Sequence, residues 1–399
     1  MYFIINVVGI LLVLGLGLLL SFNKKQVAFK PIIILFAIQL ATTWFMLSTD
    51  IGGKVITLIS DFFLWLINSS MTGINFVFGN FAPLDGTAFT LFMNVLMPII
   101  FVVVFFDILT YFGILPAIIN GVGWAFSKIA KTPRFESFYA IQVMFLGNNE
   151  ALAVTREQLN RMSDKRLLTV AMISMSCVSA GMLGGYLQIL DPKYVLIAIP
   201  LNAIGTLIIT SLINPYTVTK EEDIVYSPPK SEKGNFFDMI STSMLTGGKL
   251  ALIIAVMLIG FVSLITAANT FLGLIHDQLT LENIFGVIFS PISFFMGVEV
   301  SHIFTIGQLM GVKIVLNEFV AMTNLSTIIS SLNAHTEAVI STFLVSFCNF
   351  ATIGIILGTM KSLFGDKKTK FIADHTWLLL VSGILVSSLT AMVVGLFVW

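Results

Sequence analysis

Two glutamates stand at polar interruptions of otherwise apolar stretches, and they are the residues of this sequence best suited to chemistry. Glu318 follows Asn317, and Glu150 ends a run that reads Gly147-Asn148-Asn149-Glu150. A polar group left unpaired in hydrocarbon is costly, so such groups persist where they meet one another, water or a ligand. Carboxylates accept hydrogen bonds from hydroxyls, and amides both donate and accept. Together these side chains suit an uncharged solute rich in hydroxyl and amide groups.

Further polar residues follow in the apolar stretch after Glu318. Asn349 and Thr352 are three residues apart, a spacing that predicts one shared helix face, either in the site or in contact with a neighbouring helix. An anionic substrate would call for lysine or arginine, and only Lys313 is near. The sequence leaves open whether Lys313 neutralises a carboxylate or reaches the outer interface. Asp107, at the inner end of an apolar run, is predicted to reach the lipid headgroups.

The composition identifies the medium in which these residues lie. The chain of 399 residues is 57% apolar and 11% charged, with 21 basic and 21 acidic side chains. A soluble protein is typically about 45–50% apolar and about 25% charged. A soluble enzyme, a disordered chain and a nucleic-acid binder with a basic face are therefore excluded. Cys177 and Cys348 lie in apolar runs, so neither a disulfide framework nor a cysteine metal site is expected.

Uncharged runs of about 20 residues predict membrane-spanning helices. Eight such runs occur, at 1–23, 31–49, 86–106, 167–190, 194–216, 250–275, 338–360 and 377–399. Because its lysines follow the apolar stretch, the first run is predicted to be a retained span and not a signal peptide. All 21 lysines and arginines except Lys54, Lys193 and Lys313 fall on one side of this arrangement. The positive-inside rule then predicts that both termini lie on the side of the membrane away from the cytoplasm.

Two polar-tipped segments are too short in each arm to cross the bilayer. Ser137 to Leu146 reaches only about 15 Å as a helix, half of a bilayer. Segment 136–163 is therefore predicted to be a re-entrant hairpin from inside, and 300–332 a re-entrant hairpin from outside. Each precedes two full spans, at 167–216 and 338–399, which makes an inverted repeat. Inverted repeats with broken helices at the midplane are typical of secondary transporters, and the breaks mark the substrate site.

The predicted fold is an all-α integral membrane protein of eight transmembrane helices, two hairpins of opposite orientation and interfacial helices. Segment 54–70 is predicted to be either a helix that lies in the outer interface or an ordinary helix in a loop. Four regions follow: scaffold spans at 1–113, a first repeat at 114–216, a cytoplasmic loop at 217–247 and a second repeat at 248–399.

The hairpin tips resemble those of the concentrative nucleoside transporters. The second tip reads GVKIVLNEFVAM from Gly311 to Met322, close to the signature G-x-K-x-V-x-N-E-F-V-A of that family. The next span reads SFCNFATIGI from Ser346 to Ile355, and the first tip reads LGNNEA from Leu146 to Ala151. The stretch 193–216 also looks like the bacterial members. The resemblance covers nearly the whole chain in order and spacing.

This resemblance implies a homotrimer in which a transport domain moves past a static scaffold, with no cofactor beyond the coupling ion, no metal and no nucleic-acid partner. By carry-over, the first tip (Gly147 to Glu150) would place Asn148, Asn149 and Glu150 against the nucleobase. The groups implied to bind the ribose hydroxyls are Glu318, Asn349 and Thr352. Phe347 and Met182 would be apolar walls.

Two departures from the family pattern bear on specificity and coupling. Members usually carry Gln and then Ser or Thr where this chain has Asn148 and Asn149, and the shorter amide could favour a different or larger base. Sodium-coupled members place Asn and Ser where this chain has Val143 and Cys177. A hard cation needs oxygen ligands, which valine cannot supply and a thiol supplies poorly. This favours proton coupling, as in the bacterial subgroup, with Glu318 as the first candidate proton carrier and Glu150 as the second.

The sequence therefore predicts a proton-coupled nucleoside symporter. A sodium-coupled symporter that uses backbone carbonyls, a transporter of free nucleobases and a channel stay open as alternatives. A membrane-embedded enzyme lacks support, because the sequence shows neither a nucleophile–base pair nor an HExxH motif.

Overall fold

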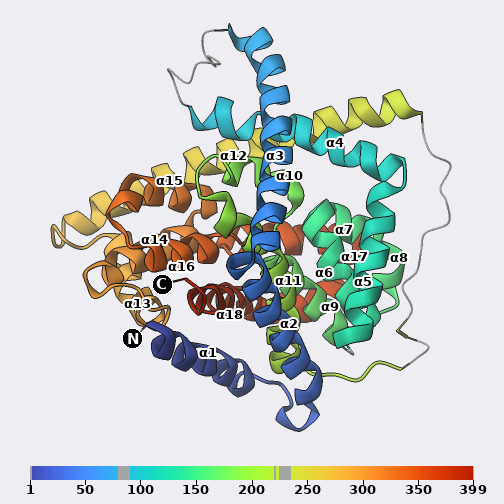
Figure 1. Cartoon of the computed structure of the whole chain (residues 1–399), viewed down its shortest axis with the longest axis horizontal. Coiled ribbons are helices and arrows are strands. Elements are labelled where there is room, and N and C mark those ends of the chain that lie inside the picture. Colours follow the sequence, from blue (N-terminus) through green and yellow to red (C-terminus); the bar gives the residue numbers. More distant parts are fainter. Residues whose placement is uncertain (1, 80–89, 131, 220–221, 224–234, 399) are drawn as a thin grey trace.

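The computed structural model describes residues 2–79, 90–130, 132–219, 222–223 and 235–398. Every element in this part of the chain is helical, and it contains no strand (Figure 1). The start of the predicted span 86–106 and most of the predicted cytoplasmic loop 217–247 lie outside the described residues.

Long apolar helices form where the sequence predicts spans. Seven helices of the described chain are long and apolar enough to cross a membrane. Four of them match predicted spans to within a few residues: α1 (Tyr2–Leu19), α2 (Phe29–Ser48), α11 (Pro192–Ile213) and α18 (Thr376–Gly395). The third predicted span begins with a π-helical turn, η3 (Leu91–Leu96), and continues as α4 (Ile99–Tyr111).

Two predicted spans are not continuous helices, so the sequence prediction was wrong in this respect. The run 167–190 forms α9 (Asp164–Ser176) and α10 (Ala180–Tyr186), separated by three extended residues from Cys177. The run 338–360 forms α16 (Ala334–Leu344) and α17 (Phe350–Asp374), separated by Val345–Asn349. Hydropathy did not locate these breaks, because neither segment contains a charged residue that would interrupt the apolar run.

Two other helices are longer than predicted. Helix α12 (Phe236–Gly273) has 38 residues and starts inside the predicted cytoplasmic loop, well before the expected span 250–275. Helix α3 (Asp50–Phe78) has 29 residues and includes the predicted interfacial segment 54–70. It begins at an N-cap, where the Thr49 side chain accepts a hydrogen bond from the Gly52 amide.

Two short helices were not predicted, and each packs against the entry arm of a hairpin. Helix α5 (Ile114–Ala130) packs on α6 (Arg134–Leu146), and α13 (Leu281–Phe295) packs on α14 (Ile303–Val315). With 17 and 15 residues they fall below the length of a span. The close approach of α13 depends on Gly311, because a Cβ there would lie 2.1 Å from the Cβ of Phe285. This glycine begins the signature at the second tip.

Both predicted hairpin tips coincide with breaks between two helices. In the first, α6 ends at Leu146, and α7 (Asn148–Val154) and α8 (Arg156–Asn160) follow. In the second, α14 is followed after Leu316 and Asn317 by α15 (Glu318–Ile328). Short 3-10 turns, η4 (Val300–His302) and η5 (Ile329–Ser331), flank the second hairpin.

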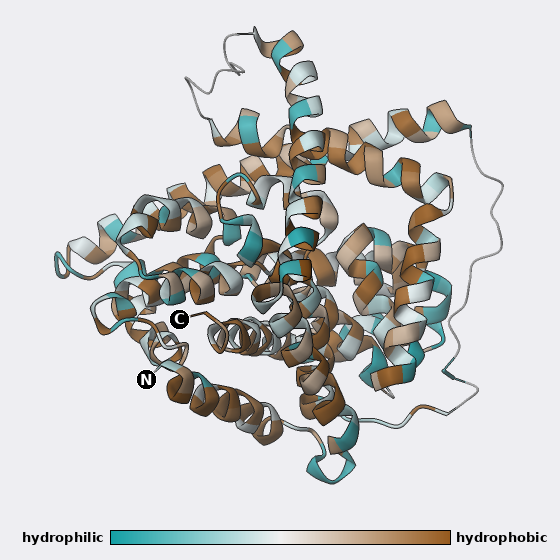
Figure 2. Cartoon of the chain, in the orientation of Figure 1, coloured by the Kyte–Doolittle hydropathy of each residue, from teal (hydrophilic) through white to brown (hydrophobic). Residues whose placement is uncertain are grey.

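The helices sort into a buried centre and an exposed layer. Helices α11 and α18 are buried along nearly all of their length, and α9 and α10 with them. Helices α4 and α12 pack together, and α12 leaves most of its apolar surface exposed (Figures 1 and 2). The hairpins lie against the buried centre: α6 packs on α9 and α11, and α14 packs on α16.

The two ends of the described chain meet at one end of the molecule. The Tyr2 ring stacks on the His335 ring with 4.7 Å between centroids. The Nδ1 atom of His335 lies 2.8 Å from the carbonyl oxygen of Val398. This arrangement is compatible with the predicted topology, in which both termini lie on the same side of the membrane.

Candidate substrate-binding site at the hairpin tips

A glycine with a left-handed backbone forms the first tip. Gly147 has φ +94°, and its amide donates to the carbonyl of Val143 at 2.9 Å, which ends α6. A Cβ at this position would lie 3.2 Å from the Cβ of Ser179, in the break between α9 and α10. Only glycine combines this φ with so close a neighbour. The first tip is thereby held beside the α9–α10 break.

The two asparagines of the first tip have different surroundings. Asn148 is buried, and its Oδ1 atom has no hydrogen-bond partner among the described residues. Asn149 is exposed, and its Oδ1 accepts a hydrogen bond of 2.8 Å from the hydroxyl of Thr359 on α17. Glu150 is exposed in the first turn of α7. The Asn148 amide is thus the group of this tip that still requires a partner.

The second tip presents a buried carboxylate. Glu318 is 4% exposed and stands in the first turn of α15. The Tyr186 hydroxyl on α10 donates to Oε1 at 2.8 Å, and the Asn349 amide donates to Oε2 at 3.2 Å. Asn317 caps the helix, its Oδ1 accepting from the Val320 amide at 3.1 Å. The carboxylate therefore joins α10 of the first repeat to the α16–α17 break of the second.

Asn349 and Thr352 come together in a way that the sequence did not predict. Asn349 is the N-cap of α17, outside the helix, and its Oδ1 accepts from the Thr352 amide at 2.8 Å and from its hydroxyl at 3.0 Å. The expectation of a shared helix face is therefore wrong, because a spacing of three is also that of an N-cap and its partner. Phe347 is half-buried in the same break.

Helix α10 sets the separation between the two tips. Ser179, just before it, contacts the first tip, and Tyr186, at its end, contacts Glu318. The two residues are seven steps apart along the chain, a rise of about 10 Å at 1.5 Å per helical residue. Met182 lies between them and is buried. The tips therefore flank a stretch long enough for a small solute of two ring systems.

The positions expected to replace sodium ligands are both buried and carry no side-chain oxygen. Val143 and Cys177 are buried, and Cys177 is a free thiol. One turn before them, the Tyr139 hydroxyl and the Ser174 hydroxyl are 2.8 Å apart and join α6 to α9. Among the described residues no group of three or more His, Cys, Asp or Glu side chains could hold a metal ion.

Lys313 does not reach the outer interface, and its ammonium interacts with the Glu318 carboxylate through space, without a direct ion pair. It is fully buried, so it does not reach an interface, and no ion pair in the described chain includes it. Its ammonium donates to the carbonyl of Phe343 at 2.9 Å and to the hydroxyl of Ser346 at 2.5 Å.

Sequence reasoning missed three residues that hold the tips: Tyr186, Ser179 and Thr359. Tyr186 follows two glycines in an uncharged run, and a tyrosine hydroxyl in such a run needs a polar partner. That signal could have identified Tyr186. Ser179 and Thr359 carry no comparable signal, because serine and threonine in apolar helices commonly bond to their own backbone.

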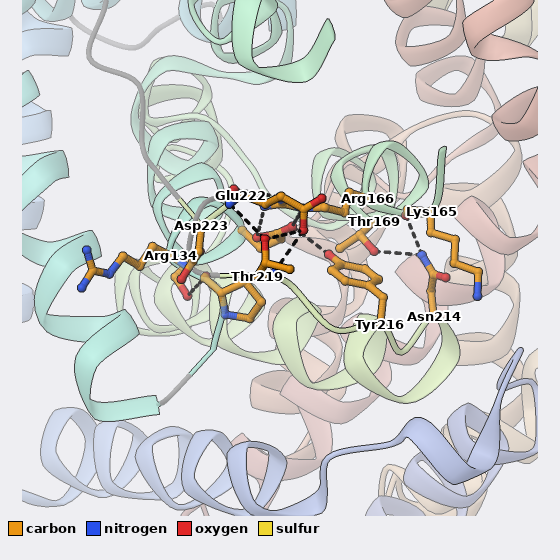
Figure 3. Close-up of polar contacts among 12 residues, drawn as sticks. Arg134, Lys165, Arg166, Thr169, Asn214, Tyr216, Thr219, Glu222 and Asp223 are labelled. Carbon is orange, nitrogen blue, oxygen red and sulfur yellow. Dashed lines mark hydrogen bonds and ion pairs between the residues drawn. The ribbon is translucent and has the colours of Figure 1, made fainter. Parts of the chain in front are cut away.

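A second polar cluster lies at the base of the first hairpin, far along α6 from the tip (Figure 3). Arg166 and Glu136 form a buried bidentate pair, with Nε 2.7 Å from Oε1 and an Nη atom 3.0 Å from Oε2. The Tyr216 hydroxyl donates to the same carboxylate at 2.8 Å. A cavity of about 340 Å³ lies beside this cluster, away from the hairpin tips.

The cluster also fixes the chain that follows α11. Arg166 donates to the Glu222 carbonyl at 3.1 Å, and the Arg134 amide donates to the Asp223 carboxylate at 2.6 Å. Partial burial raises the pKa of Asp223. The base of the first hairpin is therefore anchored by charge-assisted hydrogen bonds.

Three family models match the chain in succession. They are described as the N-terminus of Na+ dependent nucleoside transporters over residues 8–81, nucleoside recognition over 92–193, and the C-terminus of Na+ dependent nucleoside transporters over 194–395. Together they cover nearly all of the sequence.

Relatives and solved structures agree with these matches. The chain is 48% identical to the purine nucleoside transport protein NupG of Bacillus subtilis over the whole of both chains. It is 29% identical to the nucleoside permease NupC of Helicobacter pylori over 98% of this chain and 97% of that one. The structure of CNTnw in an inward-facing substrate-bound state superposes with a TM-score of 0.92 at 26% identity, covering 100% of this chain and 98% of that chain.

An outward-facing structure of a CNTnw variant superposes with a TM-score of 0.90 at 27% identity, covering 100% of this chain and 98% of that chain. The relatives are nucleoside transporters and not enzymes, in agreement with the sequence prediction. The motifs at both tips, the order of the helices and these matches over the full length show that the chain belongs to the concentrative nucleoside transporter family.

Proposed function

We propose that this chain imports purine nucleosides by proton symport across a bacterial cytoplasmic membrane. The observation that carries the proposal is the pair of polar tips, one from each repeat, which contact opposite ends of α10. A nucleoside has a hydroxyl-rich sugar at one end and an amide-like base at the other. The two tips offer complementary groups at each end.

In this proposal the sugar binds at the second tip. The Glu318 carboxylate and the Asn349–Thr352 pair supply acceptors and donors for the ribose hydroxyls. Met182 and Phe347 form the apolar walls on either side. Hydrogen bonds to a charged acceptor are stronger than neutral ones, so the sugar supplies much of the affinity.

The base binds at the first tip, where Asn148 has a buried oxygen without a partner. Asn149 and Glu150 complete this tip. The preference for purines rests on two facts: the B. subtilis relative is named a purine nucleoside transport protein, and asparagine is one carbon shorter than the glutamine usual in the family. The shorter side chain leaves room for a bicyclic base.

Proton coupling is supported by Val143 and Cys177, which offer no hard oxygen side chain to sodium. Glu318 is the proposed proton carrier, with Glu150 second. An ionised Glu318 only accepts hydrogen bonds, and both of its protein partners are donors. A protonated Glu318 gains a donor that it can offer to a ribose hydroxyl. Proton and nucleoside would then bind together.

Movement and assembly follow from the same proposal. The hairpins and broken helices would move as one transport domain past a scaffold that includes α4 and α12. The two hairpins would be re-entrant, and both termini would face outward. The exposed apolar side of α12 would meet lipid and the other subunits of a homotrimer. Leu252, Val256 and Ile259 belong to that side.

The test is uptake of labelled adenosine and uridine into proteoliposomes under an imposed proton or sodium gradient. Accumulation of adenosine above uridine, driven by the proton gradient alone, is the expected result. Accumulation driven only by sodium would overturn the coupling mechanism. If free nucleobases are transported with the same affinity as nucleosides, the substrate is the nucleobase. If the labelled solute equilibrates across the membrane without accumulating, the protein is a channel.

A further inference from the structure

Lys313 is a buried cation that forms no ion pair within the described chain, although the buried Glu318 carboxylate is near enough to interact with it electrostatically. It lies on α14 in the entry arm of the second hairpin, and its side chain is fully enclosed. Burial of an ammonium costs several kcal/mol unless polar groups replace its water. The side chain therefore persists because oxygen atoms surround it.

The three protons of the ammonium match three oxygen atoms. Nζ lies 2.9 Å from the Phe343 carbonyl, 2.5 Å from the Ser346 hydroxyl and 3.3 Å from the Ser387 hydroxyl. It also stands 4.5 Å from the centroid of the Phe343 ring, within range of a cation–π interaction. Ser346 and Ser387 are themselves 2.8 Å apart, so the ammonium joins α14, the end of α16 and α18.

These contacts fall on the break that forms part of the site. Phe343 is in the last turn of α16, where carbonyl groups have no partner in the helix and carry the negative end of its dipole. Asn202 on α11 donates to the carbonyl of Val345 at 2.5 Å. The broken segment is thus held from both sides, and Phe347 and Asn349 belong to it.

We propose that Lys313 is a positioning residue for nucleoside binding: its ammonium is a tethered cation that fixes the α16–α17 break and so sets Phe347 and Asn349 against the Glu318 carboxylate. Lys313 touches neither the substrate nor Glu318 in this role. The positive charge is required because it opposes the dipole of α16. The ammonium group that carries this charge also donates three hydrogen bonds at once. This inference rests on the proposed nucleoside site.

The experiment compares Lys313→Met, Lys313→Arg and Lys313→Ala with the unsubstituted protein in nucleoside uptake and in direct nucleoside binding. Lys313→Met keeps the length and loses the charge, and is expected to raise both KM and Kd about tenfold, the effect of leaving one buried acceptor unpaired. Lys313→Arg is expected to be affected less, because it retains the charge. The matched control is Lys193→Met, which also removes an ammonium next to an aromatic ring, that of Tyr194, and should leave KM unchanged.

Chemical rescue separates charge from packing. Ethylammonium or propylammonium added to Lys313→Ala is expected to lower KM in a concentration-dependent manner, whereas propanol should not. Rescue by propanol, or an unchanged KM in Lys313→Met, would overturn the proposal.

A second variant that retains Lys313 tests the proposal even if the Lys313 substitutions prevent the protein from folding. The double variant Ser346→Ala with Ser387→Ala removes two acceptors of the ammonium. It is expected to raise KM while the turnover number stays within about twofold of that of the unsubstituted protein. This result would mean that the lost interaction contributes equally to the bound state and to the transition state of transport. An unchanged KM there would also overturn the proposal. If the unsubstituted protein accumulates no nucleoside, the proposed function fails; if it does and these variants match it, only the role of Lys313 fails.

Discussion

The hydroxyl of Tyr186 donates a 2.8 Å hydrogen bond to the Glu318 carboxylate and so joins the two repeats through one proposed substrate ligand. The contact runs from the end of α10 to the first turn of α15. The Tyr186 and Phe319 rings pack beside it with 5.0 Å between centroids. A change in the binding partner of Glu318 therefore alters a hydrogen bond of α10, and the Ser179 end of the same helix contacts the first tip.

Glu318→Gln is expected to abolish uptake while the protein still inserts and folds. Glutamine cannot carry the coupling proton. Its amide also places a donor toward the donor of Asn349, whereas the carboxylate accepts from both partners. Uptake and nucleoside binding should be measured on the same preparation. Normal accumulation by this variant would contradict the role assigned to Glu318.

Tyr186→Phe is expected to weaken nucleoside binding without loss of fold. A hydrogen bond to a charged group contributes about 1.5–3 kcal/mol, so Kd should rise about tenfold or more. Binding titration tests this. The matched control is Tyr139→Phe, which removes another buried tyrosine hydroxyl, bonded to Ser174 and not to Glu318. Equal losses in both variants would mean that a general packing effect, and not the Glu318 contact, is responsible.

Val143→Asn combined with Cys177→Ser is expected to make uptake respond to sodium. The two substitutions restore the hard oxygen ligands that sodium-coupled relatives carry at these positions. Uptake should be measured with a sodium gradient and no proton gradient, with each single substitution as control. A folded double variant that shows no sodium response would count against these two positions as the determinant of coupling.

Asn148→Gln combined with Asn149→Thr is expected to raise uptake of uridine relative to adenosine. The longer glutamine would reach a single-ring base and crowd a double-ring one. Competition between the two labelled nucleosides gives the ratio directly. Thr359→Val is the control for loss of the Asn149 contact alone. If the ratio of uridine to adenosine uptake changes equally in Thr359→Val and in the double variant, this contact and not the length of the amide sets the preference.

Arg166→Met is expected to destabilise the protein by about 3–5 kcal/mol, because it leaves the Glu136 carboxylate buried without its partner. Thermal unfolding in detergent measures this. Adding Glu136→Gln removes the uncompensated charge and should recover most of the loss. If the single variant unfolds at the temperature of the unsubstituted protein, the pair at the base of the first hairpin is not structurally important.

The sequence predicted both tips because charged and amide side chains interrupt apolar runs there, and a membrane makes such interruptions informative. It did not predict the breaks before α10 and α17, because the polar residues there, Ser179 and Asn349 among them, are equally compatible with a continuous helix. Their broken geometry is stabilised by distant partners such as Asn202. The hydrogen bonds of Lys313 could not be predicted for the same reason: its acceptors are 30 or more residues away along the chain.

Helices α5 and α13 escaped prediction because a length criterion for spans ignores short helices that pack beside a hairpin. The N-cap at Asn349 shows a further limit. A spacing of three residues has two structural explanations, and only the backbone at the start of α17 distinguishes them.

The two tips present carboxylates and amides, and the nearest ammonium, that of Lys313, already donates to three oxygens of the protein. A phosphorylated nucleoside would bring about two negative charges beside Glu150 and Glu318, where repulsion between like charges is strong in a medium of low dielectric constant. The proposed site would therefore discriminate against nucleotides by charge. Phosphorylation after entry would convert a nucleoside into a form that the proposed site rejects, so a kinase in the cytoplasm would trap it there.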